Sequence, residues 1–240
     1  MKKDNINIIH GDAIEEMKKI DDKSIDMILC DLPYGMTRNR WDIIIPLDDM
    51  WKQFKRIVKE NGVIVLNSMQ PFSSKLIISN TEWFKYEWIW KKENVTGFLN
   101  AKKQPLRNHE NILIFYKKQC KYNPQMSPAL NGKMISSTAT KTKNYGNIKT
   151  KNTLNLNKNR YPKTIIAFKR DKEKLHPTQK SVALFEYLIE TYSNKGATVL
   201  DCCIGSGTTA IACIQSERKC IGIEKNKKYI DITNQRIKDE

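Results

Sequence analysis

The sequence contains little that would support a zinc site of the common type. It has only three histidines among 240 residues, and none of its six cysteines forms a C-x-x-C pair. Because zinc sites usually draw cysteine and histidine ligands from short, regular spacings, we expect no metal. The cysteines lie mostly in apolar stretches, where a reduced thiol packs as a small hydrophobic group. We therefore expect a reducing compartment, the cytoplasm.

Long hydrophobic runs are also missing, and acidic residues are in the minority. No stretch approaches the length of a membrane span, and residues 1–12 lack the apolar core of a signal peptide. Lysine and arginine number 42 against 26 aspartates and glutamates, which gives a formal charge of +16. A basic chain favours polyanionic partners, because its cations displace counterions condensed on phosphates. Nucleic acid is the expected partner, and the alternative interpretation is a merely soluble, lysine-rich protein.

Strand and helix patterns alternate in two parts of the chain. Short apolar runs predict seven strands, at 6–10, 26–31, 63–66, 84–90, 111–116, 198–203 and 219–224. Apolar residues at helical spacing predict helices at 14–20, 47–60, 181–192, 208–216 and 227–237, and Pro71 can open another. This alternation predicts an α/β fold with a doubly wound, mainly parallel, Rossmann-like sheet. Ligands of such sheets bind beyond the carboxyl ends of the strands.

The middle of the chain has a different composition. Residues 117–174 are rich in Lys, Asn, Thr and Ser and show weak hydrophobic periodicity. Such a segment is either a disordered loop or an insertion that binds a partner.

A glycine-rich loop follows the predicted strand that ends near Asp201. Gly205 and Gly207 permit a tight turn and a close backbone approach to a ligand, and Glu224 ends the next strand. A carboxylate at that position can accept both hydroxyl hydrogens of a ribose. The loop fits S-adenosylmethionine, a nicotinamide dinucleotide, or glycines that merely turn a strand into a helix. Asp201 favours S-adenosylmethionine, since a carboxylate can lie near its cationic methionine part.

A second acid-headed loop, Asp31-Leu32-Pro33-Tyr34-Gly35, follows another buried strand. One interpretation is a proline turn with a packing tyrosine. The other is chemical, because the amine of adenine or cytosine is a poor nucleophile until acceptors on its hydrogens localise its lone pair. The Asp31 carboxylate and the Leu32 carbonyl can be those acceptors, and Asp31 would stabilise the positive charge that develops on nitrogen. Pro33 restricts Leu32 to an extended conformation, and Tyr34 offers a ring on which the base can stack.

With its two loops in this order, the chain resembles the β group of DNA amino-methyltransferases. In that family a D-P-P-Y-like loop precedes the target-recognition region, and the glycine loop comes last. The stretch His176-Pro177-Thr178-Gln179-Lys180 resembles the family's H-P-T-x-K-P element, which contacts the cofactor. Gly11-Asp12-Ala13 resembles the G-D-x element near the cofactor adenine. Leu32, Cys203 and Ser181 depart from the pattern, because proline, phenylalanine and proline are usual at these positions.

The resemblance implies a site-specific enzyme that moves a methyl group from S-adenosylmethionine to N6 of an adenine flipped out of double-stranded DNA. It implies that Asp31, Leu32, Pro33 and Tyr34 are catalytic. The residues expected to bind the cofactor are Asp12, Ala13, Asp31, His176, Thr178, Lys180, Asp201, Ile204, Gly205, Ser206, Gly207, Thr208 and Glu224.

The resemblance also divides the chain. Residues 1–118 become the catalytic part, 119–174 the target-recognition insertion and 175–240 the S-adenosylmethionine-binding part of the same methyltransferase domain. Residues 94–108 join the insertion as candidates for sequence readout. Pairing of two chains and a partner nuclease stay open, and no membrane partner is expected.

Four alternatives remain beside adenine methylation in DNA. An aspartate at the head of the catalytic loop is more typical of adenine enzymes, whereas cytosine-N4 relatives more often carry serine there. Methylation of cytosine N4 and methylation of RNA are the nearest alternatives. A dinucleotide-dependent oxidoreductase would leave the Asp31 loop and the basic insertion without a role. The last alternative, an inactive DNA-binding protein, is disfavoured by the intact Asp31 and Tyr34.

Overall fold

The computed structural model describes residues 5–37, 39, 42–128, 159–171, 175 and 179–240. The chain forms two compact units, one made of Met1–Asn123 with Thr164–Glu240 and the other of Pro124–Lys163. In the second unit, β6 (Ser127–Pro128) pairs antiparallel with β7 (Asn159–Arg160). This unit falls within the segment of weak periodicity.

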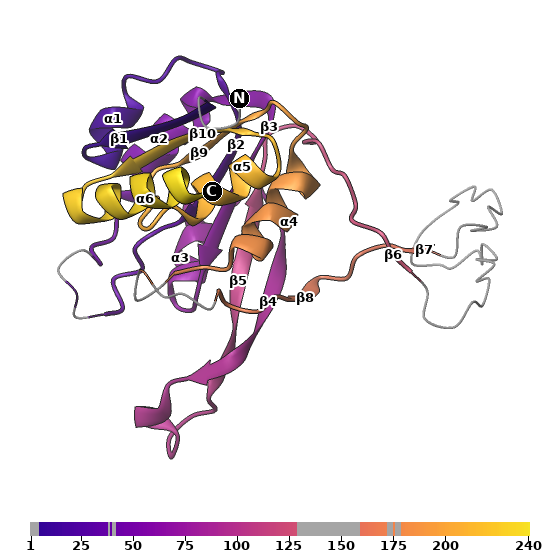
Figure 1. Ribbon diagram of the computed structural model, residues 1–240. Helices are drawn as coiled ribbons and strands as arrows, with labels where there is room; N and C mark the ends of the chain where they lie inside the picture. Colours follow the sequence, from indigo (N-terminus) through magenta and orange to yellow (C-terminus); the bar gives the residue numbers. More distant parts are fainter. Residues whose placement is uncertain (1–4, 38, 40–41, 129–158, 172–174, 176–178) are drawn as a thin grey trace. The chain divides into compact units, whose positions relative to one another are not determined.

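The first unit is built on an eight-stranded sheet in the order β1-β10-β9-β2-β3-β5-β4-β8 (Figure 1). The strands are β1 (Ile6–His10), β2 (Ile25–Asp31), β3 (Val58–Ser68), β4 (Phe84–Thr96), β5 (Arg107–Phe115), β8 (Ile165–Ala167), β9 (Thr198–Asp201) and β10 (Lys219–Glu224). The strands from β1 to β3 in this order are parallel, and β5 runs antiparallel to both β3 and β4. The predicted α/β class with a mainly parallel sheet is confirmed. The eighth strand, β8, pairs parallel to β4 and was not predicted, because it comes from the polar segment.

Helices cover both faces of the sheet and create two cores (Figure 1). One face carries α1 (Ala13–Met17), α2 (Leu47–Ile57) and α3 (Phe72–Ser79), and the other carries α4 (Val182–Tyr192), α5 (Thr208–Gln215) and α6 (Lys227–Asp239). Because successive side chains of a strand point to opposite faces, a central strand supplies both cores. In β2, Ile28 and Cys30 join the core under α2, whereas Met27 and Leu29 join the core under α4.

The core under α4 ends in a row of polar side chains. Four neighbouring strands, β2, β3, β5 and β4, place an apolar residue in this core at every second position. On each strand, the next position that faces this side of the sheet carries a polar residue. These residues are Asp31, Asn67, Glu110 and Lys92. The row therefore lies just beyond the hydrophobic core under α4. It is at the same end of the strands as the predicted catalytic loop, which begins at Asp31.

Some predicted boundaries differ from the structure, and the clearest case lies between α2 and β3. The helix expected at 47–60 ends at Ile57, because Val58 adopts an extended conformation with φ −73° and ψ 139°. Val58 pairs with Ile25 of β2, so residues 58–60 belong to β3. An apolar residue at position 58 fits both the helical and the strand pattern. Its pairing with β2 in the folded chain makes it part of the strand.

Beyond the sheet, β4 and β5 continue together as a long hairpin (Figure 1). The 3₁₀ helix η2 (Phe98–Asn100) lies at its tip, where Phe98 is 66% exposed and Leu99 is fully exposed. The hairpin tip coincides with the segment predicted to read DNA sequence. Among the described residues, no helix has the length and hydropathy needed to cross a membrane.

Candidate active site

The loop that follows β2 is anchored at both ends. Leu32 is buried in the core under α2, which fixes the start of the loop, and Pro33 is half-buried. Asp42 accepts hydrogen bonds from the backbone N–H groups of residues 35–37 at 2.6–2.9 Å, which fixes the turn after Tyr34. Burial raises the pKa of Asp42, but these hydrogen bonds favour its ionised form more strongly and hold the pKa below its usual value. Sequence reasoning missed Asp42.

The Asp31 carboxylate at the end of β2 has two partners. Its Oδ1 accepts a hydrogen bond from Tyr34 Oη at 2.5 Å, and its Oδ2 lies 2.8 Å from Lys180 Nζ. The Tyr34 ring packs against Phe72 with 5.4 Å between ring centroids, and Lys180 Nζ lies 5.7 Å from the Tyr34 centroid. Lys180 therefore contacts both the acid and the aromatic residue of the predicted catalytic loop.

Lys180 also belongs to a chain of buried charges. Its Nζ lies 3.1 Å from Glu110 Oε2, and Glu110 Oε1 lies 2.9 Å from Lys92 Nζ. The side chains of Lys180, Glu110 and Lys92 are 8%, 6% and 3% exposed, and that of Asp31 is 21% exposed. Acids and bases alternate along the chain Asp31–Lys180–Glu110–Lys92, so its formal charge is zero. Buried ions persist only when they are paired, and this alternation supplies the pairing.

The pKa shifts of these groups follow from burial and from their neighbours. Burial raises the pKa of Asp31, and the Lys180 cation offsets only part of that effect. Burial acts in the same direction on Glu110, but Lys180 and Lys92 outweigh it and lower the pKa of Glu110 to about 2. Burial lowers the pKa of Lys180, but its two carboxylate neighbours have the larger, opposite effect. The pKa of Lys180 is therefore raised, and Lys180 stays a cation.

The glycine loop after β9 is organised by Asp201. This residue is buried, its Oδ1 accepts from the backbone N–H of Cys203 at 3.0 Å, and its Oδ2 accepts from the Thr209 hydroxyl. Burial raises the pKa of Asp201 to about 7, and the hydrogen bond from Thr209 opposes that shift. Asp201 thus ties the loop to the start of α5. The contact with a cofactor that we expected of it stays a prediction.

Glu224 lies across from this loop at the end of β10. Its Oε2 accepts from the backbone N–H of Gly205 at 3.1 Å, and its Oε1 accepts from that of Asn226 at 2.7 Å. An ionised carboxylate offers about four lone-pair positions, so two remain for other donors. The backbone carbonyl of Glu224 also accepts a hydrogen bond from the N–H of Gly11 at 3.0 Å, which brings the end of β1 next to Glu224.

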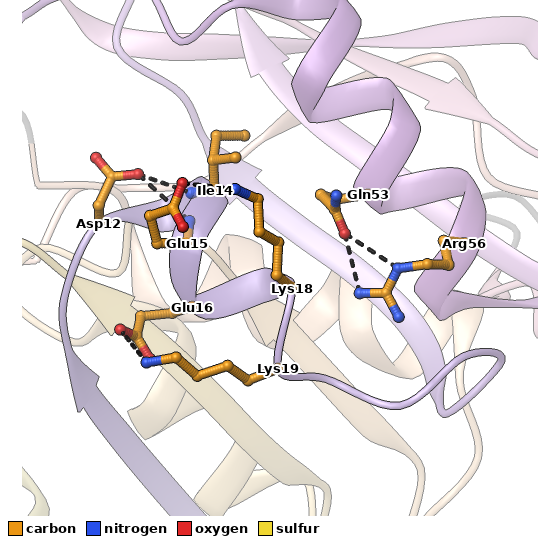
Figure 2. A network of polar contacts seen from close by, with 8 residues as sticks. All are labelled: Asp12, Ile14, Glu15, Glu16, Lys18, Lys19, Gln53 and Arg56. Carbon is orange, nitrogen blue, oxygen red and sulfur yellow. Dashed lines mark hydrogen bonds and ion pairs between the residues drawn. The ribbon is translucent and has the colours of Figure 1, made fainter.

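Asp12 follows β1 and begins α1. Its Oδ1 accepts from the backbone N–H groups of Ile14 at 3.0 Å and Glu15 at 3.5 Å, and Ala13 is the first helical residue (Figure 2). In the same view Arg56 of α2 donates to Gln53 (Figure 2). Arg56 also donates to the Met17 carbonyl at the end of α1. The predicted G-D-x element is therefore a capped helix start beside Glu224.

The remaining predicted residues lie along the glycine loop. Ile204 is buried, and its backbone N–H donates to the Ile223 carbonyl at 3.0 Å. The Ser206 hydroxyl lies 3.4 Å from Gln179 Oε1, and the Thr208 hydroxyl lies 3.5 Å from the Lys180 carbonyl. These contacts join the loop to the segment before α4. His176 and Thr178 lie outside the described residues.

Sequence reasoning also missed three cysteines that meet where β2 and β9 end. Cys30, Cys202 and Cys203 place their sulfur atoms within 4.8 Å of one another, and Cys30 Sγ lies 3.6 Å from Cys202 Sγ. Their sequence spacing carried no sign of this cluster, because strand pairing brings Cys30 to the other two. The expectation of no metal remains a prediction.

Asn67 of β3 is a buried polar residue next to Asp31. It is fully buried, it pairs in register with Asp31, and neither polar atom of its side chain has a hydrogen-bond partner within the described part of the chain. Buried polar groups are nearly always satisfied in native proteins, by water or ligand where protein groups do not reach. Unused hydrogen-bonding capacity therefore lies directly beside the Asp31 carboxylate.

A family described as DNA methylase, N6_N4_Mtase, matches residues 25–235. The chain belongs to this DNA methylase family. Among the relatives of this methylase, the DNA adenine methyltransferase YhdJ of Escherichia coli (strain K12) is 32% identical in an alignment 249 residues long, which covers 96% of this chain and 82% of YhdJ. The type II methyltransferase M.HinfI of Haemophilus influenzae is 31% identical in an alignment 281 residues long, which covers 100% of this chain and 71% of M.HinfI.

Solved structures agree with this membership. The crystal structure of the M1.HpyAVI–SAM complex has a TM-score of 0.66 and 26% sequence identity, and the match covers 96% of this methylase and 99% of that chain. The cytosine-N4-specific PvuII DNA methyltransferase has a TM-score of 0.68 at 14% identity, covering 98% and 95% of the two chains, and shows the fold alone. The predicted resemblance to DNA amino-methyltransferases is confirmed.

Proposed function

We propose that this methylase transfers a methyl group from S-adenosylmethionine to N6 of adenine in double-stranded DNA. The observation that carries the proposal is the Asp31 carboxylate, held at the end of β2 between Tyr34 and Lys180. Adenine is favoured because an aspartate heads the loop and because YhdJ is named a DNA adenine methyltransferase. Cytosine N4 is the second candidate, because the name of the family covers both N6 and N4 methylation.

The residues around the glycine loop fit S-adenosylmethionine. When bound, this cofactor supplies an electrophilic methyl group on a positively charged sulfur. Gly207 has φ +84° and begins α5, so the loop backbone can approach a ligand closely. Glu224 keeps two lone-pair positions for ribose hydroxyls, and Asp12 lies next to it beyond β1. The similar M1.HpyAVI was solved as a SAM complex, which supports S-adenosylmethionine as the cofactor.

The Asp31 loop would prepare the amine for attack. The ionised carboxylate keeps lone pairs beyond those used by Tyr34 and Lys180, and one can accept a hydrogen of the amine. We assign the second acceptor to the Leu32 carbonyl and the stacking surface to the Tyr34 ring, which packs against Phe72. As the C–N bond formed, the bond from the methyl carbon to sulfur would break and its electron pair would stay on sulfur as a neutral thioether. The amino nitrogen would then carry one proton too many, and Asp31 is placed to take it. Most of the rate then comes from charge stabilisation and orientation.

DNA contacts would come from the β4–β5 hairpin and from the predicted insertion at 119–174. The hairpin tip presents exposed Phe98 and Leu99 together with Lys102 and Lys103, a combination that suits base contact and phosphate neutralisation. A base within a duplex cannot reach Asp31, so the target must be flipped out. Pairing of two chains and a partner nuclease remain open, and the cytoplasm remains the predicted location.

The test replaces Asp31. Asp31→Asn and Asp31→Ala should lower transfer of tritiated methyl groups to DNA by at least about 10²-fold, the usual effect of losing one group that stabilises transition-state charge. S-adenosylmethionine binding, measured by calorimetry, should persist in Asp31→Asn, whereas Asp201→Ala should weaken it by loosening the glycine loop. Mass spectrometry of digested nucleosides identifies the product. Near-wild-type transfer by Asp31→Ala would exclude the mechanism, and N4-methylcytosine as product would select the second candidate.

A further inference from the structure

We propose that Glu110 is a positioning residue for methyl transfer, which acts on Asp31 through Lys180 and is itself held by Lys92. The proposal rests on the proposed function of Asp31. No predicted motif contains Glu110 or Lys92, which lie on the antiparallel strands β5 and β4. The chain Asp31–Lys180–Glu110–Lys92, with contacts of 2.8, 3.1 and 2.9 Å, connects both residues to the reacting group.

Glu110 determines where the ammonium group of Lys180 lies. A lysine side chain has four flexible carbons and a compact charge, so a single partner leaves it several positions. Here Asp31 Oδ2 and Glu110 Oε2 contact the ammonium group from two strands at 2.8 and 3.1 Å. Without Glu110, Lys180 would keep one carboxylate partner and close onto Asp31, where it would compete with the amine for lone pairs.

Glu110 also adjusts the charge that Asp31 experiences. Lys180 divides its attraction between two carboxylates, so it does not fully neutralise Asp31. The negative charge of Glu110 raises the pKa of Asp31, while Lys180 lowers it. A carboxylate whose pKa is kept up in this way is the stronger hydrogen-bond acceptor and the stronger base for the departing proton.

Lys92 makes a buried glutamate tolerable at this point. Glu110 is 6% exposed, and Lys92, 3% exposed, contacts the Glu110 oxygen that Lys180 does not use. A lone buried carboxylate would take up a proton or distort the strand. With two lysines beside it, Glu110 remains ionised and continues to act on Lys180.

The test compares Glu110→Gln with wild type in steady-state kinetics over a range of pH. We expect kcat to fall at least about tenfold, since small misplacement of catalytic groups costs up to about 10²-fold. We expect KM for S-adenosylmethionine to change little. The acid limb of the kcat profile should move to lower pH by roughly one unit, because loss of a nearby negative charge lowers the pKa of Asp31. A merely structural role would lower Tm and the active fraction without moving this limb.

Two further variants keep the result decisive. Glu87→Gln is the matched control, because Glu87 is a β4 carboxylate that accepts from Asn111 at 2.7 Å and lies outside the charge chain. It should leave kcat and the acid limb unchanged. The double variant K92M/E110Q removes one charge of each sign, so it should fold even where Glu110→Gln alone does not, and it should keep the low kcat and the displaced limb.

Wild-type kcat with an unmoved acid limb in either Glu110 variant would overturn the proposal. Nucleoside analysis of the wild-type product separates this result from failure of the proposed function. A product other than N6-methyladenine overturns the substrate assignment. The Glu110 comparison, made on whichever base is methylated, still decides the positioning role.

Discussion

Replacing Lys180 by methionine should move the pH dependence of methyl transfer upward. Methionine keeps most of the length and apolar volume of lysine but removes the cation that lies 2.8 Å from Asp31 and 3.1 Å from Glu110. The two carboxylates would then face each other with Lys92 as the one remaining cation of the charge chain. The sequence alone assigned Lys180 to the cofactor, so this variant also decides between two roles.

The expected shift follows from the geometry. An opposite charge within about 4–6 Å lowers a carboxylate pKa by roughly 1–3 units, so loss of Lys180 should raise the pKa of Asp31 by about that amount. Asp31 would then stay protonated to higher pH, and the acid limb of the kcat profile would move upward. Each unit corresponds to about 1.4 kcal/mol. Breaking a buried ion pair costs about 3–5 kcal/mol of stability, and the lower end applies because Asp31 is 21% exposed.

The assay is transfer of tritiated methyl groups to DNA by Lys180→Met and wild type across the range in which both are folded, as checked by thermal unfolding. Lys195→Met serves as control, since Lys195 pairs with Glu217 on the surface at 70% exposure and should leave the profile in place. A raised KM for S-adenosylmethionine with an unmoved acid limb would refute the reasoning. Lys180 would then serve the cofactor alone.

Three other predictions follow from the structure. Gly207→Ala should abolish S-adenosylmethionine binding in calorimetry, because its Cβ would lie 2.7 Å from a side chain of α6, whereas Gly196→Ala, with φ +79° and open space, should cost only about 1–2 kcal/mol of stability and leave binding intact. Lys102→Ala with Lys103→Ala should weaken DNA binding and reduce the slope of log affinity against log salt by about 2 in a filter-binding titration; an unchanged slope would remove the hairpin from the interface. Glu110, with its pKa lowered to about 2 from 4.5, contributes stability that is present above pH 4.5 and lost as pH falls toward 2, about 3 kcal/mol in all. Urea unfolding of wild type and Glu110→Gln should therefore converge over that range, and a constant difference would contradict it.

Much of the fold was determined by local pattern. Strands buried on both faces must be continuously apolar, so the central strands could be read from runs of Ile, Leu, Val and Met. Chain order and βα alternation then placed Asp31 and Asp201 at strand ends on one edge of a mainly parallel sheet, as the structure shows. The glycine loop and the Asp31 loop were recognisable because their chemistry depends on residues adjacent in sequence.

The charge chain beside Asp31 was decided by tertiary structure. Alternation along β5 and β4 could have marked Glu110 and Lys92 as inward-facing, yet it could not say which residues they face. That depends on the antiparallel register of β5 with β3 and β4, and on α4 covering the same face so that Lys180 enters beside them. Contacts of this kind join residues far apart in sequence, and a buried charge is stable only once its partner has arrived. The sequence by itself therefore determined the Asp31 loop and its predicted catalytic role, whereas the charged environment of its carboxylate exists only in the folded chain.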